Sequence, residues 1–352
     1  MAWQGIVDEY RSRLELSPGA KAVSLLEGRT PLVPLPRLAR SLGEGVELYA
    51  KFEGLNPSGS FKDRGMTVAV TQAVHDGAQA VVCASTGNTA ASAAAYAARA
   101  GIKCVVVVPE GKVALGKLAG AIAYGAQVVQ IRGSFDDALL MVREASQRSA
   151  LCLVNSVNPS RIEGQKTAAF EVVDDLGDAP DFLCLPVGNA GNTTAYWKGF
   201  SDELQTGRTT KRPVVVGVQA AGSAPMVLGH PVTDPQTVAT AIRIGNPARW
   251  NEAATAFRES GGHVRAVSDD AILAMARALA QEEGVFCEPS SATGLAGFAK
   301  AVAEGAIDPR GKRVVAVVTG HGMKDPDNAM AGRPAPVTID ATTDALLREV
   351  ER

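Results

Sequence analysis

Apolar and polar positions alternate along much of the chain in blocks of two kinds. Short apolar runs are typical of buried strands, and the longer stretches between them carry the periodicity of helices. In the first series the apolar runs lie at 80–84, 102–108, 127–131 and 151–154, and the helical stretches at 88–100, 113–124 and 134–148. Strands that alternate with helices in this way predict a parallel sheet.

A second series of the same kind follows residue 160. Its apolar runs lie at 182–187, 214–219 and 313–318, and its helical stretches at 162–176, 193–205, 268–283 and 290–304. A chain of 352 residues is also too long for one ordinary core. We therefore predict an α/β fold of two domains, each a mainly parallel sheet flanked by helices. We expect a smaller, mobile domain at 52–157 and a larger domain made of 1–51 and 158–352.

The segments outside the two series carry weaker patterns. Residues 3–15 predict a short polar helix, and the prolines within 25–38 exclude a helix there. The region 220–262 contains four prolines, which favours a loose cover or an oligomer contact. A last helix is predicted near 341–350.

Composition and charge limit the classes of partner. Acidic and basic residues number 37 and 35, a net charge of −2, which argues against a nucleic-acid surface or a polybasic membrane patch. No apolar stretch reaches the roughly 18 residues of a membrane helix, and the N-terminus has no signal-peptide pattern. Five cysteines without a Cys-x-x-Cys pair are typical of buried thiols in a reducing compartment. We expect a cytoplasmic protein with a small-molecule ligand and no metal.

The segment 56–65 joins an apolar, alternating strand at 46–52 to a helix at 66–74, for which Ser60 is the predicted N-cap. Lys62 then lies in the first turn, where free N–H groups and the helix macrodipole disfavour an ammonium and lower its pKa. A lysine in this position is suited to form a Schiff base. A solvated surface lysine is the alternative, because lysines are almost always exposed.

Two further strand ends carry groups suited to anions. Ser85-Thr86-Gly87-Asn88-Thr89 follows one strand and opens the next helix, so its hydroxyls, amide and N–H groups suit a carboxylate. Gly188-Asn189-Ala190-Gly191-Asn192 has two glycines that admit a close backbone approach, which suits a phosphate. Ordinary helix caps and a tight turn without a ligand are the alternatives. Thr319 ends a further predicted strand, where its hydroxyl is placed to meet a ring nitrogen.

The segments 60–65, 85–89 and 188–192 resemble the fold type II pyridoxal-phosphate enzymes, the tryptophan synthase β-like group. Within this group the chain is similar to the threonine synthase family, and the similarity covers nearly its whole length. The narrower resemblance rests on three segments, at 154–159, 161–167 and 319–326.

The resemblance implies pyridoxal 5'-phosphate as cofactor, in the cleft between the two domains. Lys62 would hold the cofactor covalently and, once displaced by substrate, move protons. Asn88 would hydrogen-bond the phenolic oxygen, and Thr319 would face the pyridine nitrogen. The cofactor phosphate would be held by Gly188, Asn189, Ala190, Gly191 and Asn192. The substrate α-carboxylate would be held by Ser85, Thr86 and Thr89.

The reaction that the resemblance implies converts O-phospho-L-homoserine and water to L-threonine and phosphate, the last step of threonine biosynthesis. It is a β,γ-elimination and replacement by a carbon–oxygen lyase that acts on phosphates, in which the released phosphate assists proton transfer. The family also implies a homodimer. The substrate phosphate demands a second anion pocket, for which we expect Asn155, Ser156 and Arg161 at the end of the strand 151–154, since an arginine offers a bidentate fork. Asn189 and Lys117 are secondary candidates, and a surface position is the alternative for Arg161.

Other functions remain open on the same fold. A serine/threonine dehydratase resembles this chain less, because its phosphate loop has a run of glycines where this chain has asparagines. A cysteine-synthase-like enzyme acting on acetylserine would not need a distal anion site. A non-catalytic amino-acid-binding protein is the alternative from another class, against which the presence of Lys62 argues.

Overall fold

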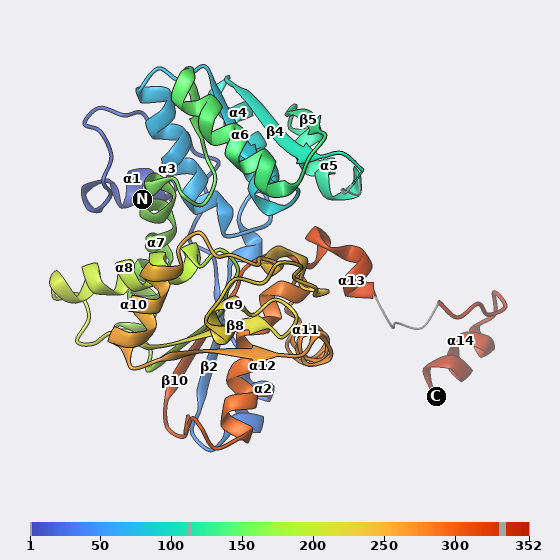
Figure 1. Cartoon of the computed structure of the whole chain (residues 1–352). Helices are drawn as coiled ribbons and strands as arrows, with labels where there is room; N and C mark the ends of the chain where they lie inside the picture. The colour runs from blue at the N-terminus through green and yellow to red at the C-terminus, as the bar shows by residue number, and fades with distance from the viewer. Residues whose placement is uncertain (1, 112–114, 331–335, 352) are drawn as a thin grey trace.

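The computed structural model describes residues 2–111, 115–330 and 336–351. Within these ranges the chain forms two sheets, seen as an upper and a lower body in Figure 1. The larger sheet has six strands in the order β1-β2-β10-β7-β8-β9, and only β1 is antiparallel to its neighbour. Its strands are β1 (Leu32–Pro34), β2 (Glu47–Phe52), β7 (Phe182–Pro186), β8 (Val214–Ala220), β9 (His263–Val267) and β10 (Arg313–Val318).

The smaller sheet is parallel throughout, in the order β5-β4-β3-β6. Its strands are β3 (Ala80–Ala84), β4 (Lys103–Pro109), β5 (Gln127–Ile131) and β6 (Leu151–Leu153). The helices that accompany it are α3 (Lys62–His75), α4 (Asn88–Ala100), α5 (Leu115–Ala123) and α6 (Phe135–Arg148). The predicted α/β class with two mainly parallel sheets is therefore confirmed.

The remaining helices accompany the larger sheet or lie at the ends of the chain. They are α1 (Ile6–Glu9), α2 (Pro36–Leu42), α7 (Pro159–Leu176), α8 (Gly191–Gln205), α9 (Pro225–Leu228), α10 (Trp250–Ser260), α11 (Asp269–Glu283), α12 (Pro289–Ala303), α13 (Pro326–Met330) and α14 (Thr343–Val350). Short 3-10 helices are η1 (Arg11–Arg13), η2 (Glu53–Leu55), η3 (Thr240–Ile242) and η4 (Gly322–Lys324). The helix α14 has no buried residue and lies apart from both sheets. Of the helices described, none is long and apolar enough to cross a membrane.

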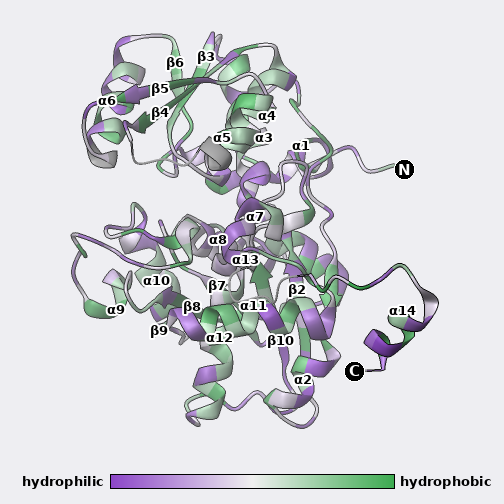
Figure 2. Ribbon diagram, turned by 90° about the vertical axis from the view of Figure 1, so that its right-hand side faces the viewer, coloured by the Kyte–Doolittle hydropathy of each residue, from purple (hydrophilic) through white to green (hydrophobic). Residues whose placement is uncertain are grey.

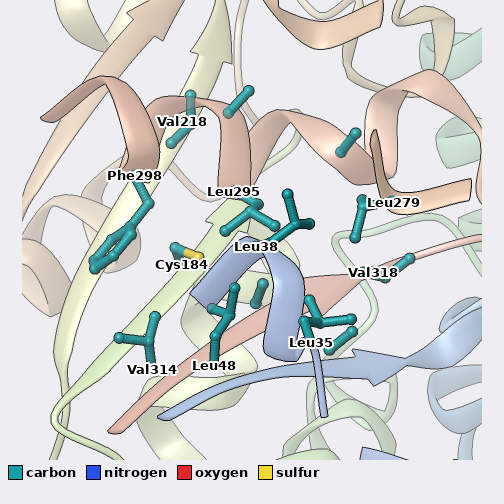
Figure 3. Close-up of a cluster of buried hydrophobic side chains, with 14 of the residues drawn as sticks. Leu35, Leu38, Leu48, Cys184, Val218, Leu279, Leu295, Phe298, Val314 and Val318 are labelled. Carbon is teal, nitrogen blue, oxygen red and sulfur yellow. The ribbon is translucent and has the colours of Figure 1, made fainter. Parts of the chain in front are cut away.

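Both faces of the larger sheet are buried, which is why its strands are continuous apolar runs in the sequence. On one face the strands pack against α2, α11 and α12, where Leu35, Leu295 and Phe298 contribute to one cluster (Figure 3). On the other face a second cluster includes Tyr196 and Phe200 of α8. Figure 2 shows the hydrophobic character of the strands in both sheets. The smaller sheet has a core of its own.

The structure corrects the predicted elements in four places. The helix after the segment 56–65 begins earlier than predicted, at Lys62, with Phe61 at the N-cap position in place of Ser60. The connector 25–38 contains β1 and the start of α2. A helix can begin at Pro36 because the backbone N–H group at the first helical position has no intrahelical partner, so proline loses no hydrogen bond there.

The other two corrections concern the N-terminus and the proline-containing region. The helix predicted at 3–15 extends only over α1 and the short η1, and α1 is not polar throughout, since its Ile6 and Val7 are buried. The region 220–262 contains the regular helix α10, whose Ala253, Ala256 and Phe257 form one buried face. The strand β9, which follows α10, was not predicted.

Candidate active site

Helices α3 and α7 cross with their backbones in contact at two glycines. A Cβ atom on Gly164 would overlap the carbonyl oxygen of Arg64, and one on Gly65 would lie 2.7 Å from the carbonyl oxygen of Arg161. Any larger residue would push the helices apart, so the crossing depends on glycine at both positions. The crossing brings the first turn of α3 against the first turn of α7, and with them Lys62 and Arg161.

Lys62 is the first residue of α3, and its side chain is half-buried. Burial lowers the pKa of its amine to about 7, the nearby charge of Arg161 lowers it further, and Glu288 acts in the opposite direction. The ammonium group lies 4.2 Å from the ring centroid of Phe61. An amine with this pKa is partly neutral near pH 7, and the neutral form is the nucleophile and the base.

The loop before Lys62 is fastened to the end of β10. The backbone N–H of Phe61 donates to the carbonyl oxygen of Thr319 at 2.9 Å, and that of His321 donates to Gly59 at 2.9 Å. These bonds join the loop of the candidate lysine to Thr319, the predicted partner of a ring nitrogen, although the two lie far apart in the sequence.

Asp63 fixes the same loop from its other side. Its buried carboxylate accepts hydrogen bonds from the hydroxyl of Ser58 at 2.5 Å, from the N–H of Ser58 at 2.6 Å and from the hydroxyl of Ser92 at 2.6 Å. Burial raises the pKa of Asp63 to about 6, and these hydrogen bonds oppose the rise. Lys324 adds a bond from its ammonium to the carbonyl oxygen of Ser58, at 2.9 Å.

Two polar pairs lie next to this loop. Asn88, the first residue of α4, donates from Nδ2 to Oε1 of Glu288 at 2.9 Å. Thr319 shares a hydrogen bond of 2.8 Å with the hydroxyl of Ser291, and either oxygen can donate. Both pairs are buried. Asn88, in a helix beside the smaller sheet, therefore contacts Glu288, the residue before α12. Thr319, after a strand of the larger sheet, contacts Ser291 in the first turn of α12.

The glycine loop after β7 has free donors at the start of α8. Ala190 is the N-cap residue and has a φ of 62°, so the chain turns sharply into the helix. The side-chain atoms Asn192 Nδ2 and Thr193 Oγ1 are buried without a hydrogen-bond partner. Unpaired buried donors at a helix N-terminus fit an anion such as phosphate. The loop as predicted, Gly188–Asn192, thus provides a chemically suitable cradle.

The residues predicted for the substrate carboxylate lie where β3 gives way to α4. Ser85 and Thr86 are half-buried in the turn, and Thr89 is in the first turn of the helix. The Oγ of Ser85 accepts from the N–H of Gly87 at 3.3 Å. Like the loop at α8, this one presents hydroxyl groups beside the N–H groups of a helix start.

Asn155 differs from the expectation for a substrate contact, because its amide is already paired. Its Oδ1 accepts from the N–H of Ala84 at 3.0 Å, and its Nδ2 donates to the carbonyl oxygen of Ala84 at 2.9 Å. Asn155 therefore ties the end of β6 to the end of β3.

Arg161 is almost fully buried, with 1% of its surface exposed, which excludes the alternative of a surface charge. One nitrogen, Nη1, donates to the carbonyl oxygen of Val154 at 3.0 Å, while Nε and Nη2 are buried without a partner. Burial lowers the pKa of Arg161 to about 10, so the guanidinium stays charged at neutral pH. A buried cation with two free donors is incomplete without an anion.

Arg249 joins the two predicted phosphate loops. Its guanidinium donates to the carbonyl oxygens of Ser156 at 3.4 Å and Val157 at 3.0 Å. Its backbone N–H donates to the carbonyl oxygen of Asn189 at 3.2 Å. The structure thereby brings both Ser156 and Asn189 into contact with one residue, Arg249. The side chain of Lys117, the other secondary candidate, lies outside the part of the chain that the structure describes.

Three residues of the site were not predicted. Glu288 and Ser291 belong to the sequence Glu-Pro-Ser-Ser before and within the first turn of α12, and this helix-start pattern was the available signal. Arg249 lies in the proline-containing region that was interpreted as loose, and no pattern there distinguishes it from a surface arginine.

The chain is similar to known proteins along most of its length. The model of the family "Pyridoxal-phosphate dependent enzyme" matches residues 23–320. A threonine synthase of Synechocystis is 56% identical over 328 residues, which cover 93% of this chain and 85% of the relative. A threonine synthase of Mycobacterium bovis is 55% identical over 341 residues, covering 96% and 94%. Among solved structures, threonine deaminase isoform 2 of Solanum lycopersicum superposes with a TM-score of 0.73 at 25% identity, covering 87% of this chain and 89% of that one.

Proposed function

Because the chain belongs to the family of pyridoxal-phosphate dependent enzymes, we propose that it works as a threonine synthase. It converts O-phospho-L-homoserine and water to L-threonine and phosphate, the last step of threonine biosynthesis. As such it is a carbon–oxygen lyase that acts on phosphates. The structural observation that carries the proposal is Arg161, a buried cation with two unpaired donors whose charge acts on Lys62.

The residues at the strand ends fit the cofactor. Lys62 would hold it covalently, and the loop 188–192 with the unpaired Asn192 Nδ2 would hold its phosphate at the start of α8. Asn88 would donate to the phenolic oxygen, and Thr319 would face the pyridine nitrogen, where a hydroxyl in place of a carboxylate leaves the ring less protonated. When bound, pyridoxal 5'-phosphate supplies an electron sink for negative charge that develops on the amino-acid substrate.

Lys62 is the group that moves protons. The reaction requires loss of a proton at Cα and then at Cβ, and later return of a proton. A base works best with a pKa near the working pH, and the lowered pKa of about 7 meets this condition. The hydrogen bonds of Asp63 to Ser58 and Ser92 hold the loop before Lys62 in one conformation. The amine is therefore positioned before each proton transfer, and no conformational entropy is lost in placing it.

The γ-phosphate of the substrate would bind Arg161. The free Nε and Nη2 form the pair of parallel donors that suits two oxygens of a phosphate. Ser156 would contribute its hydroxyl from the adjacent turn, and the paired Asn155 would hold that turn in position. The substrate carboxylate would lie at the N-terminus of α4 with Ser85, Thr86 and Thr89.

A dehydratase on the same fold is the second candidate, supported by the structural likeness to a threonine deaminase. Its substrates have no phosphate, so a dehydratase would leave Arg161 without its anion. The same argument separates this chain from an enzyme acting on acetylserine and from a non-catalytic amino-acid-binding protein.

Product analysis tests the function directly. Purified protein with pyridoxal phosphate and O-phospho-L-homoserine is expected to release threonine and phosphate in equal amounts. Phosphate together with 2-oxobutyrate would mean elimination without controlled addition of water. No phosphate release at all, with turnover of serine or acetylserine, would overturn the proposal.

We further propose a cytoplasmic homodimer whose smaller domain, 52–157, moves against the larger one. The five free cysteines, of which four are buried, support a reducing compartment. Sedimentation at equilibrium would test the dimer, since a mass of 36.4 kDa is expected for a monomer.

A further inference from the structure

Glu288 is a buried acid that the reaction described above does not use. It lies just before α12 with 4% of its surface exposed. Its backbone N–H donates to the carbonyl oxygen of Gly320 at 3.1 Å, and its side chain reaches Asn88 of the other sheet. A Cβ atom on Gly320 would lie 2.5 Å from Oε1 of Glu288 and 3.4 Å from Nδ2 of Asn88. The pair is thus packed directly against the end of β10.

Charged and titratable groups from three neighbouring segments act on Glu288. Burial raises the pKa of its carboxyl to about 7; the hydrogen bond from Asn88 and the charges of Lys324 and Lys62 lower it, and Asp325 raises it. Cys287, the adjacent residue, has a thiol whose own pKa is raised by burial and by Glu288, so it remains protonated. Two cations and a hydrogen bond therefore oppose the effect of burial, and the carboxyl group is mainly ionised above about pH 7.

A carboxylate selects one orientation of the Asn88 amide. An ionised carboxylate only accepts hydrogen bonds, so the amide nitrogen and not the amide oxygen must face Glu288. The nitrogen carries two N–H groups, of which this bond uses one. The second N–H is left for another acceptor at the same site.

We propose that Glu288 is a positioning residue for the cofactor: by accepting one N–H of Asn88, it directs the second N–H to the phenolic oxygen of bound pyridoxal phosphate. The inference rests on the cofactor-binding part of the proposed function and does not involve the amino-acid substrate. A glutamine at this position can present either an oxygen or an NH2 group, so it keeps the size of the side chain and loses the selection.

Titration of cofactor-free protein with pyridoxal phosphate, followed by visible absorbance, tests the proposal. The variants are Glu288→Gln, Asn88→Ala and the two combined. Glu288→Gln is expected to weaken cofactor binding about ten- to a hundredfold, the range for a hydrogen bond to a charged group. Since Glu288 acts through Asn88, the double variant is expected to bind within about twofold of Asn88→Ala alone.

The pH dependence provides a second readout. Protonation of Glu288 below about pH 7 removes the selection, so affinity in the unsubstituted protein falls as the pH drops through 7. Glu288→Gln is expected to lose that component of the pH dependence. Glu283→Gln is the matched control, because its carboxylate accepts from the backbone N–H of Leu38 at 2.7 Å, in the contact between α11 and α2.

Three results would overturn the proposal. One is unchanged cofactor affinity in Glu288→Gln, and another is a double variant that shows the sum of both losses. If Glu288→Gln does not fold, Glu288→Asp replaces it, because aspartate retains the charge on a side chain too short to reach Asn88. Full cofactor affinity in Glu288→Asp is the third result that would overturn the proposal. All these measurements are made without the amino-acid substrate. Their result is therefore independent of whether the protein forms threonine.

Discussion

At the scale of single residues, the site shifts the pKa values of its ionisable groups in the direction that favours their neutral forms. Burial is the largest cause in each case: it lowers the pKa of Lys62 to about 7 and raises the pKa of Glu288 to about 7 and that of Asp63 to about 6. Such groups reduce the folding stability of the protein without ligand. Ligands that pair with these groups raise the folding stability again. Perturbed groups gathered at one place are a mark of a functional site.

The lowered pKa of the Lys62 amine makes the stability of the cofactor-free protein depend on pH. Its folded pKa of about 7 lies below the ordinary value of 10.5, so between these values the unfolded chain binds more protons. Stability therefore rises with pH across this window. Lys62→Met is expected to be more stable than the unsubstituted protein at pH 7, with a difference that shrinks towards pH 10, as measured by urea unfolding. Lys103→Met, at an exposed position, is the control. A difference independent of pH would contradict this prediction.

Arg161 is expected to act on substrate binding and not on the cofactor. Arg161→Ala removes a pair of charge-assisted hydrogen bonds, so KM for O-phospho-L-homoserine should rise about a hundredfold, while the absorbance of the bound cofactor stays unchanged. Arg161→Met provides a variant of similar volume if the cavity left by alanine destabilises the fold. Arg258→Ala, an exposed position on α10, is the control. An unchanged KM would remove Arg161 from the substrate site.

Which site residues the sequence could predict depends on whether a local pattern marks them. Lys62, Asn88 and the loop 188–192 each follow a strand and start a helix, so their positions are evident from neighbouring residues. Glu288 becomes part of the site only because α12 packs beside the start of α4, two hundred residues away. The pairing of Asn155 with Ala84 has the same origin in the register of β3 and β6.

At the scale of elements, the apolar runs predicted strands well because both faces of each sheet are covered. The strand limits at β5 and β10 and the limits of α4 agree with the prediction. The strand β9 was missed because it lies at the edge of its sheet and most of its residues are only half-buried, so its run is less apolar. Prolines misled the prediction at α2, where Pro36 starts a helix instead of preventing one.

The glycine crossing of α3 and α7 is the element contact on which the site depends most. Gly164→Ala would place a methyl group into the backbone of α3 at Arg64, so we expect a loss of at least about 1–3 kcal/mol in stability, the usual cost of overpacking, and weaker cofactor binding. Gly120→Ala in α5 is the matched control, because its Cβ would meet only Ala91 at 3.5 Å, and alanine favours a helix by roughly 0.5–1 kcal/mol. Equal stability in the two variants, by thermal unfolding, would contradict this account of the crossing.

At the scale of the whole molecule, the candidate site is formed from both sheets. Lys62 and Asn88 accompany the smaller sheet, while Thr319 and the loop 188–192 follow strands of the larger one. Arg249 joins the turn after β6 to the glycine loop at Asn189. The candidate site therefore draws its residues from both halves of the chain.

This arrangement predicts closure of the two halves when the phosphate site is filled. A non-hydrolysable phosphonate analogue of O-phospho-L-homoserine, added to the cofactor-bound protein, is expected to reduce the radius of gyration in small-angle X-ray scattering and to slow proteolysis of 52–157. The reason is that Nε and Nη2 of Arg161, in the larger half, are buried without a partner, and we expect Ser156, in the smaller half, to bind the same anion. Arg161→Ala should show no change at an analogue concentration that saturates the unsubstituted protein, which separates closure from general ligand effects. If scattering and proteolysis remain the same while equilibrium binding shows the analogue bound, the two halves do not close on substrate, and the site must exclude water in its resting geometry.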